Sequence, residues 1–175
     1  MKKSLYEIYV PELKAEVGNV LVSDPKAVIG RITNIDITSF TKGKNGSIKI
    51  KLVSSNGSRI DGSIIGIKFF PSHIRRFVRR GISKIEDSFV VSVGKEKLRM
   101  KPTLMTRKRV KGKVQKALRR ETRDFLAKSL ADSNPELVFN EIIGGDLQKK
   151  LSQKLKKVYP LSFCEIREAR YEGKK

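Results

Sequence analysis

The residues of this chain that could do chemistry are arginines and lysines, and many of them fall in one short segment. Nine cations and a single acidic residue, Glu121, lie between Arg107 and Arg123. A guanidinium group stays charged, and its planar fork of donors can bind a phosphate through two parallel hydrogen bonds or stack on a base. The chemistry that these residue types predict is the binding of phosphates and bases.

The spacing of these cations argues against an ordinary solvated helix face. Like charges four residues apart, as in Lys116/Arg120 and Arg119/Arg123, destabilise a helix by about 0.2–0.5 kcal/mol per pair. The charge is also unevenly distributed, because residues 73–123 hold eighteen cations and four acidic residues, or +14 of the net +21 of the whole chain. Such a density of one sign predicts a polyanion as the partner.

No set of residues predicts catalysis. His73 is the only histidine, which excludes a histidine-based metal site or catalytic triad within one chain. The glycines at 43–46 and 144–145 lack the spacing and the Lys-Ser/Thr of a phosphate-binding loop. The single Cys164 has no electropositive flank and is interpreted as a buried structural thiol. We therefore expect a protein that is not an enzyme and that has no cofactor and no metal.

The composition also helps to choose among polyanions. Membrane-binding helices pair a basic face with an apolar face that enters lipid, whereas the apolar residues here are needed for the core. No recognition helix, basic zipper or zinc finger of a DNA reader is visible. Trp is absent and aromatic residues make up 7% of the chain, which disfavours a stacking platform for single strands. A broad basic surface favours folded RNA.

Short strands are predicted over most of the first 104 residues. One apolar and one mostly cationic face alternate over residues 48–53, a return strand is expected over 60–69 with Ile65, Ile67 and Phe69 in alternation, and Asn56-Gly57 between the two favours a hairpin turn. Further strands are expected at 89–93 and 98–102, the second near a sheet edge because it contains Pro102. A small antiparallel sheet or barrel is the economical arrangement, since an isolated hairpin would not be stable.

Helical patterns follow, with one earlier exception. Residues 72–81 fit a helix with an apolar stripe on one face and four arginines on the other. Residues 113–130 repeat apolar side chains with a helical period, and shorter helices are expected at 135–143 and 146–158. The final segment, 161–170, is predicted to be a strand.

These elements predict one α+β domain over residues 1–175, with a small antiparallel β-barrel-like core and appended α-helices that are mainly C-terminal. Residues 5–104 would form the mostly β core with one basic helix, 105–158 the helical part and 159–171 a closing strand. No apolar run is long enough to span a membrane, and the start lacks the apolar region of a signal peptide, so we expect a cytoplasmic protein.

Several short blocks occur in a characteristic order from Leu5 to Arg170. They are Tyr6-Glu7-Ile8-Tyr9-Val10-Pro11, Asp24-Pro25, Ile29-Gly30-Arg31, Ile74-Arg75-Arg76-Phe77-Val78-Arg79-Arg80, Ile85-Glu86-Asp87, Leu98-Arg99-Met100-Lys101-Pro102, Val158-Tyr159-Pro160-Leu161 and Glu165-Ile166-Arg167. In these blocks the sequence resembles the archaeal and eukaryotic small-subunit ribosomal protein family called S-three-A-e, or eS-one. It shows neither the lysine-rich N-terminal nor the acidic C-terminal extension of eukaryotic members, so it resembles the archaeal form.

The resemblance implies a structural protein of the small ribosomal subunit, bound to ribosomes in the cytoplasm. It implies a place on the subunit platform near the messenger exit and the 3′ end of the rRNA. The partners would be small-subunit rRNA, neighbouring platform proteins and, indirectly, the exiting messenger, with no membrane contact and no homo-oligomer. The alternative is a free RNA-binding translation regulator or ribosome assembly factor that visits ribosomes transiently.

The candidate rRNA-binding residues are the cations of the basic stretches between residues 75 and 123. They are Arg75, Arg76, Arg79, Arg80, Arg99, Lys101, Arg107, Lys108, Arg109, Lys111, Lys113, Lys116, Arg119, Arg120 and Arg123. Of these, Arg99 and Lys101 should project from the face of their strand that lies opposite the apolar Leu98 and Met100.

Overall fold

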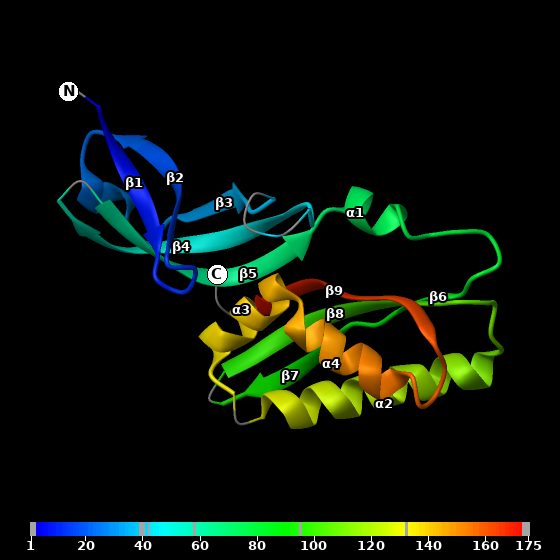
Figure 1. Cartoon of the computed structure of the whole chain (residues 1–175). Coiled ribbons are helices and arrows are strands. Elements are labelled where there is room, and N and C mark those ends of the chain that lie inside the picture. The colour runs from blue at the N-terminus through cyan, green and yellow to red at the C-terminus, as the bar shows by residue number, and fades with distance from the viewer. Residues whose placement is uncertain are drawn as a thin grey trace.

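Nine β-strands in the described part of the chain form one branched sheet, which is accompanied by helices (Figure 1). The computed structural model describes residues 3–38, 41, 43–57, 59–94, 96–131 and 133–172. The strands are β1 (Ser4–Val10), β2 (Ala15–Val22), β3 (Ile32–Asp36), β4 (Gly46–Asn56), β5 (Arg59–Phe69), β6 (Lys84–Glu86), β7 (Phe89–Val93), β8 (Glu96–Thr106) and β9 (Leu161–Tyr171). The helices are the 3-10 helix η1 (Pro25–Val28) and the α-helices α1 (Pro71–Arg75), α2 (Gly112–Leu130), α3 (Pro135–Gly144) and α4 (Asp146–Leu155). The predicted α+β class is confirmed.

The sheet first branches at β5. One edge of β5 pairs antiparallel with β4 over nearly its whole length. The other edge is divided, because residues 59–61 pair in parallel with β1 and residues 66–68 pair antiparallel with β9. β2 lies beyond β1, and β3 lies beyond β4. The sheet is therefore mixed, and β9 joins its N-terminal strands to its C-terminal ones.

The predicted closure into a barrel is wrong. The N-terminal strands do curl, since Cδ1 of Ile35 on β3 lies 3.6 Å from where a Cβ would stand at Gly18 on β2. However, no backbone pairing joins β2 to β3 among the described residues, so the sheet stays open. A barrel closes only where strand number, tilt and stagger agree. Here part of one edge of β5 pairs with β9, and β9 pairs with β8. The sheet is therefore extended by β9 and β8 and is not closed by pairing with β3.

The second branch point, β8, is a central strand and not the predicted edge strand. β9 pairs along one side of β8, while β7 and β6 pair with successive parts of the other side. Pro102 lies between the residues that pair with β7 and those that pair with β6, next to a register shift toward β9. A proline has no N–H to donate, so a sheet tolerates it at an interruption of this kind.

The three longer helices pack against the strands of the sheet and against one another (Figure 1). α2 contacts β7, α4 contacts β9 and α3 contacts β5, while α4 also touches both other helices. α2 begins one residue before its predicted start, and Leu118, Leu126 and Leu130 of the predicted apolar stripe are buried. None of the helices in the described ranges is long and apolar enough to cross a membrane.

The helix predicted over residues 72–81 is much shorter than expected. α1 ends at Arg75, and Phe77 and Val78 remain 38% and 45% exposed instead of forming a buried stripe. Arginines four apart, such as Arg75 and Arg79, would repel each other in further helical turns. Phe77, which lies beyond the end of α1, also stacks on Phe163 of β9. The four arginines of this stretch therefore do not share one helix face.

Candidate nucleic-acid interface

One group of predicted cations lies on the solvent face of α2. The helix turns Leu118 and Leu126 toward the core, so the opposite face is free for charged side chains. That face forms a shallow hollow of ≈ 260 Å³, lined by Lys116, Arg119, Arg120, Arg123 and Asp124. The one acidic residue in it, Asp124, lies 3.8 Å from Arg120 in an exposed pair. An exposed pair of this kind contributes little stability, so Arg120 remains available to another anion.

The segment between β8 and α2 presents cations on a backbone that the fold holds in place. The Val110 N–H donates to Oγ of Ser83 at 3.0 Å, and the Gln115 side-chain amide donates to the Val110 carbonyl at 3.2 Å. Five cations here are exposed and have no ion-pair partner among the described residues: Arg107, Lys108, Arg109, Lys111 and Lys113. An external anion would meet no internal competitor at these positions.

Three other candidates are held by carboxylates of the protein itself. The pairs are Arg99–Glu172, Lys101–Glu168 and Arg123–Asp87. In the last of them Arg123 donates two hydrogen bonds to Asp87, at 2.6 and 2.7 Å. These hydrogen bonds hold the pKa of Asp87 below its ordinary value. An RNA phosphate at Arg123 would have to share the guanidinium with Asp87.

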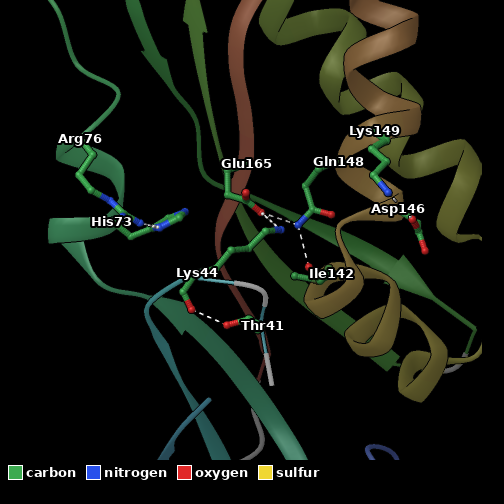
Figure 2. A network of polar contacts seen from close by, with 9 residues as sticks. All are labelled: Thr41, Lys44, His73, Arg76, Ile142, Asp146, Gln148, Lys149 and Glu165. Carbon is green, nitrogen blue, oxygen red and sulfur yellow. Dashed lines mark hydrogen bonds and ion pairs between the residues drawn. The ribbon is translucent and has the colours of Figure 1, made fainter. Parts of the chain in front are cut away.

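The arginines of residues 75–80 divide into two groups. Three are exposed and have no ion pair within the described ranges, namely Arg75, Arg79 and Arg80. Arg76 reaches back toward the protein (Figure 2), where its Nη2 lies 2.6 Å from Nδ1 of His73 and 3.3 Å from the carbonyl oxygen of Gly43. Because a guanidinium only donates, Nδ1 of His73 accepts and its ring proton sits on Nε2.

His73 lies in an aromatic cluster that no pattern in the sequence predicts. Its ring centroid is 5.6 Å from that of Phe77, at an interplanar angle of 69°. Phe77 in turn stacks on Phe163 of β9, with the ring centroids 4.1 Å apart and the planes inclined by 21°. Burial, and next the charge of Arg76, lowers the pKa of His73. No spacing in the sequence links these rings, because they come from α1, the turn after it and the last strand.

Two hollows flank the stacked pair of Phe77 and Phe163. The first, of ≈ 450 Å³, is lined by Gly43, Lys44, His73, Arg76, Phe77, Phe163 and Glu165. The second, of ≈ 280 Å³, is lined by Phe77, Arg79, Ile82, Arg107, Ser162 and Phe163. The second hollow therefore brings together a cation of the 75–80 stretch and the first cation of the 107–123 stretch.

The buried carboxylate of Glu165 lines the first hollow, and Figure 2 shows its polar contacts. Oε1 of Glu165 lies 3.3 Å from Nζ of Lys44 and accepts a hydrogen bond from Nε2 of Gln148 at 2.6 Å. Gln148 on α4 also donates to the carbonyl oxygen of Ile142 on α3 at 2.9 Å. Burial raises the pKa of the Glu165 carboxyl, although Lys44 and Gln148 oppose this shift. This network joins an N-terminal loop to β9 and to two helices.

The site is a surface of exposed cations on a backbone held by hydrogen bonds, an arrangement typical of proteins that bind a polyanion through the geometry of their surface. Among the described residues, no group of three or more histidine, cysteine, aspartate or glutamate side chains could hold a metal ion. Cys164 on β9, predicted to be buried, is half-buried beside the apolar cluster that includes Leu118, Leu151 and Leu155, and desolvation raises the pKa of its thiol to about 12.

A sequence model of the Ribosomal S3Ae family matches residues 1–174, so the chain belongs to this family of structural ribosomal proteins, which are not enzymes. The chain is 27% identical over 176 residues to the small ribosomal subunit protein eS1 of Methanoculleus marisnigri, which covers 97% of this chain and 89% of the relative. It is 28% identical over 173 residues to the protein of the same name from Nanoarchaeum equitans, with 95% and 87% covered. These relatives are archaeal, and the resemblance to the archaeal form is confirmed.

Proposed function

We propose that this chain is a structural constituent of the small ribosomal subunit that holds folded rRNA on the platform, near the messenger exit and the rRNA 3′ end. Relatives that align with nearly the whole chain are named small ribosomal subunit proteins. The observation that carries the proposal is the run of exposed cations from Arg107 to Lys113 without internal carboxylate partners, continued by the basic face of α2. Neighbouring platform proteins are the further partners, and the site of action is the ribosome in the cytoplasm.

The cations would act by replacing the counterions of RNA phosphates. Each phosphate that is neutralised releases counterions, so the affinity falls with salt by a slope of about 0.7–0.9 per contact. Cations without an internal partner contribute most, because no ion pair has to be given up first. The backbone of the segment before α2 fixes the spacing of these contacts, which suits recognition of one folded RNA surface.

The test is the salt dependence of binding to small-subunit rRNA. A variant in which Arg107, Arg109, Arg119 and Arg120 are replaced by glutamine should bind with a slope lower by about three than the wild-type slope. The control variant replaces four exposed lysines outside α2 by glutamine, Lys26, Lys154, Lys156 and Lys157, and so removes the same charge. If both variants lower the slope equally, net charge and not this surface governs binding. If neither does, the segment is outside the RNA contact.

A free regulator or assembly factor would behave differently on ribosomes. A structural protein should remain at one copy per small subunit after a wash in high salt, as quantified by mass spectrometry of sedimented subunits. Occupancy well below one copy, together with a large unbound pool, would favour the transient factor and contradict the proposed role.

A further inference from the structure

The stacked pair of Phe77 and Phe163 is an unusual feature for the surface of this protein. Phe77 is 38% exposed, although the chain has few aromatic residues and buries most of its large apolar side chains. The ring is held in place, because it stacks on Phe163, meets the buried His73 in a T-shaped contact and has the Arg76 guanidinium carbon 6.0 Å from its centroid. A rigid, partly exposed aromatic surface can stack on a nucleobase whatever its identity, since every base has a π-face.

The charges around this pair differ between its two sides. The hollow on the Lys44 side contains the carboxylate of Glu165, which would repel a phosphate. The hollow on the other side is lined by Arg79 and Arg107 and includes no acidic residue. Both arginines are exposed and have no ion-pair partner in the described part of the chain. A group that combines an aromatic face with a negative charge therefore fits the Arg79–Arg107 side.

We propose that the Arg79–Arg107 hollow receives one unpaired nucleotide of the bound RNA, with its base on the stacked pair and its phosphate on Arg79 and Arg107. This inference rests on the proposed function and adds to it a single-stranded contact. A base inside a duplex is stacked on its neighbours and cannot present its face to a side chain, so the nucleotide must come from a loop, a bulge or an end. Arg107 also begins the cation run that leads into α2, so the hollow lies at the margin of the surface proposed for folded RNA.

The low aromatic content of the chain is compatible with this site. A platform that tracks a long single strand needs a series of rings, whereas one stacked pair serves one nucleotide. The scarcity of aromatic residues, which disfavours a stacking platform for a long single strand, is therefore compatible with a contact to one base. A docking neighbour protein is the competing occupant, but the rim of this hollow is cationic, with Arg79 and Arg107 beside the rings.

The first test uses the intact wild-type protein bound to small-subunit rRNA and irradiated with ultraviolet light. Aromatic side chains that stack on a base form zero-length crosslinks, which mass spectrometry locates. The expected product joins a peptide containing Phe77 or Phe163 to a nucleotide that is unpaired in the RNA. Crosslinks that map to α2 alone, with none at either phenylalanine, would overturn the inference while leaving the proposed function intact.

The second test compares substitutions that keep or remove the aromatic face. Phe77→Leu should lower the affinity for protein-free small-subunit rRNA about tenfold, because leucine fills space but cannot stack. Phe77→Tyr should bind like wild type, and Val78→Ala, at an exposed neighbour outside the hollow, is the matched control. Unchanged affinity of Phe77→Leu, beside a reduced salt slope in the arginine-to-glutamine variant, would remove the nucleotide site but not the RNA surface. Normal affinity for naked rRNA with weakened retention in whole subunits would assign the hollow to a protein neighbour and overturn the inference.

Discussion

Nζ of Lys44 and Oε1 of Glu165 lie 3.3 Å apart, and this ion pair joins a loop of the N-terminal half to β9 (Figure 2). The same carboxylate oxygen accepts the hydrogen bond from Gln148 on α4. Glu165 is only 5% exposed, and burial raises the pKa of its carboxyl. The junction between the two halves of the sheet therefore contains a carboxylate that water solvates poorly.

Replacing Glu165 by glutamine should make stability less dependent on pH. A carboxyl with a raised pKa holds a proton in the folded chain that the unfolded chain has already released, so the wild type loses stability as the pH rises above the ordinary value of 4.5. Glutamine undergoes no such titration. Urea unfolding of the free protein at several pH values should show the variant gaining stability relative to the wild type as the pH rises.

The control for this experiment is Glu16→Gln, which changes an exposed carboxyl on β2. Its free energy of unfolding should follow that of the wild type over the same pH range. If the difference between Glu165→Gln and the wild type were independent of pH, the Glu165 carboxyl would not be titrating above its ordinary range in the folded state.

Asp87→Asn should change stability and RNA affinity in opposite directions. The hydrogen bonds from Arg123 lower the pKa of Asp87, so their stabilisation is present above the ordinary value of 3.8 and is lost as the pH falls below it. At neutral pH the substitution should cost about 1 kcal/mol, as for a well-oriented surface pair. It also releases Arg123 and removes a negative charge beside α2, so affinity for small-subunit rRNA should rise.

Asp24→Asn provides the comparison, because it removes the same charge from an exposed position near η1. It should leave both stability and affinity close to the wild-type values. Equal gains in affinity for the two variants would mean that the effect comes from net charge and not from freeing Arg123.

Elements that depend on local pattern were predictable from the sequence. The two strands predicted at 48–53 and 60–69, with a glycine at the turn, correspond to β4 and β5, and Gly57 takes a φ of +60° there. The helical period after residue 112 corresponds to α2. β4 and β5 contact mainly each other across the hairpin, and the apolar stripe of α2 repeats with the period of a helix whatever it packs against, so the periodicity of side chains is enough to identify each element.

Features that depend on distant partners were not predictable. Pro102 predicts an edge strand, but β8 is central. The proline is tolerated there because it lies between the residues of β8 that pair with β7 and those that pair with β6. The apolar stripe at 74–78 suggests a helix, but Phe77 stacks on a residue of the last strand. The cations of the candidate surface were recognised by charge alone, whereas their division into paired and unpaired groups depends on where Glu172, Glu168 and Asp87 lie in space.

The single histidine offers a direct probe of the aromatic cluster. Burial, and next the charge of Arg76, lowers the pKa of His73 below its ordinary value of 6.5. Because the unfolded chain binds the proton first as the pH falls, the folded state should lose stability below about pH 6.5. The ring resonance of this one histidine, followed by NMR, should titrate with a midpoint under 6.5.

Arg76→Gln tests the cause of this shift. It removes the charge that faces Nδ1 of His73 while keeping a donor, so the midpoint should move upward toward the ordinary value. Arg75→Gln, an exposed arginine in the same helix, should leave the midpoint unchanged. A wild-type midpoint at or above 6.5 would contradict both the burial of the ring and its contact with Arg76.

Two glycine-to-alanine substitutions should have opposite effects on stability. A Cβ at Gly62 on β5 would stand 2.3 Å from Cγ2 of the buried Ile50, so Gly62→Ala should overpack the core and cost about 1–3 kcal/mol. Gly112 begins α2 with nothing within 4 Å of an added Cβ, and Gly112→Ala should stabilise by about 0.4–1 kcal/mol by restricting the unfolded chain. In denaturant unfolding without RNA, the midpoint of Gly62→Ala should be lower than that of the wild type and the midpoint of Gly112→Ala higher. If the midpoint of Gly62→Ala equalled that of the wild type, β4 and β5 would not pack this closely at Gly62. Ile50 is buried, so its side chain could not swing into solvent to make room for the added Cβ.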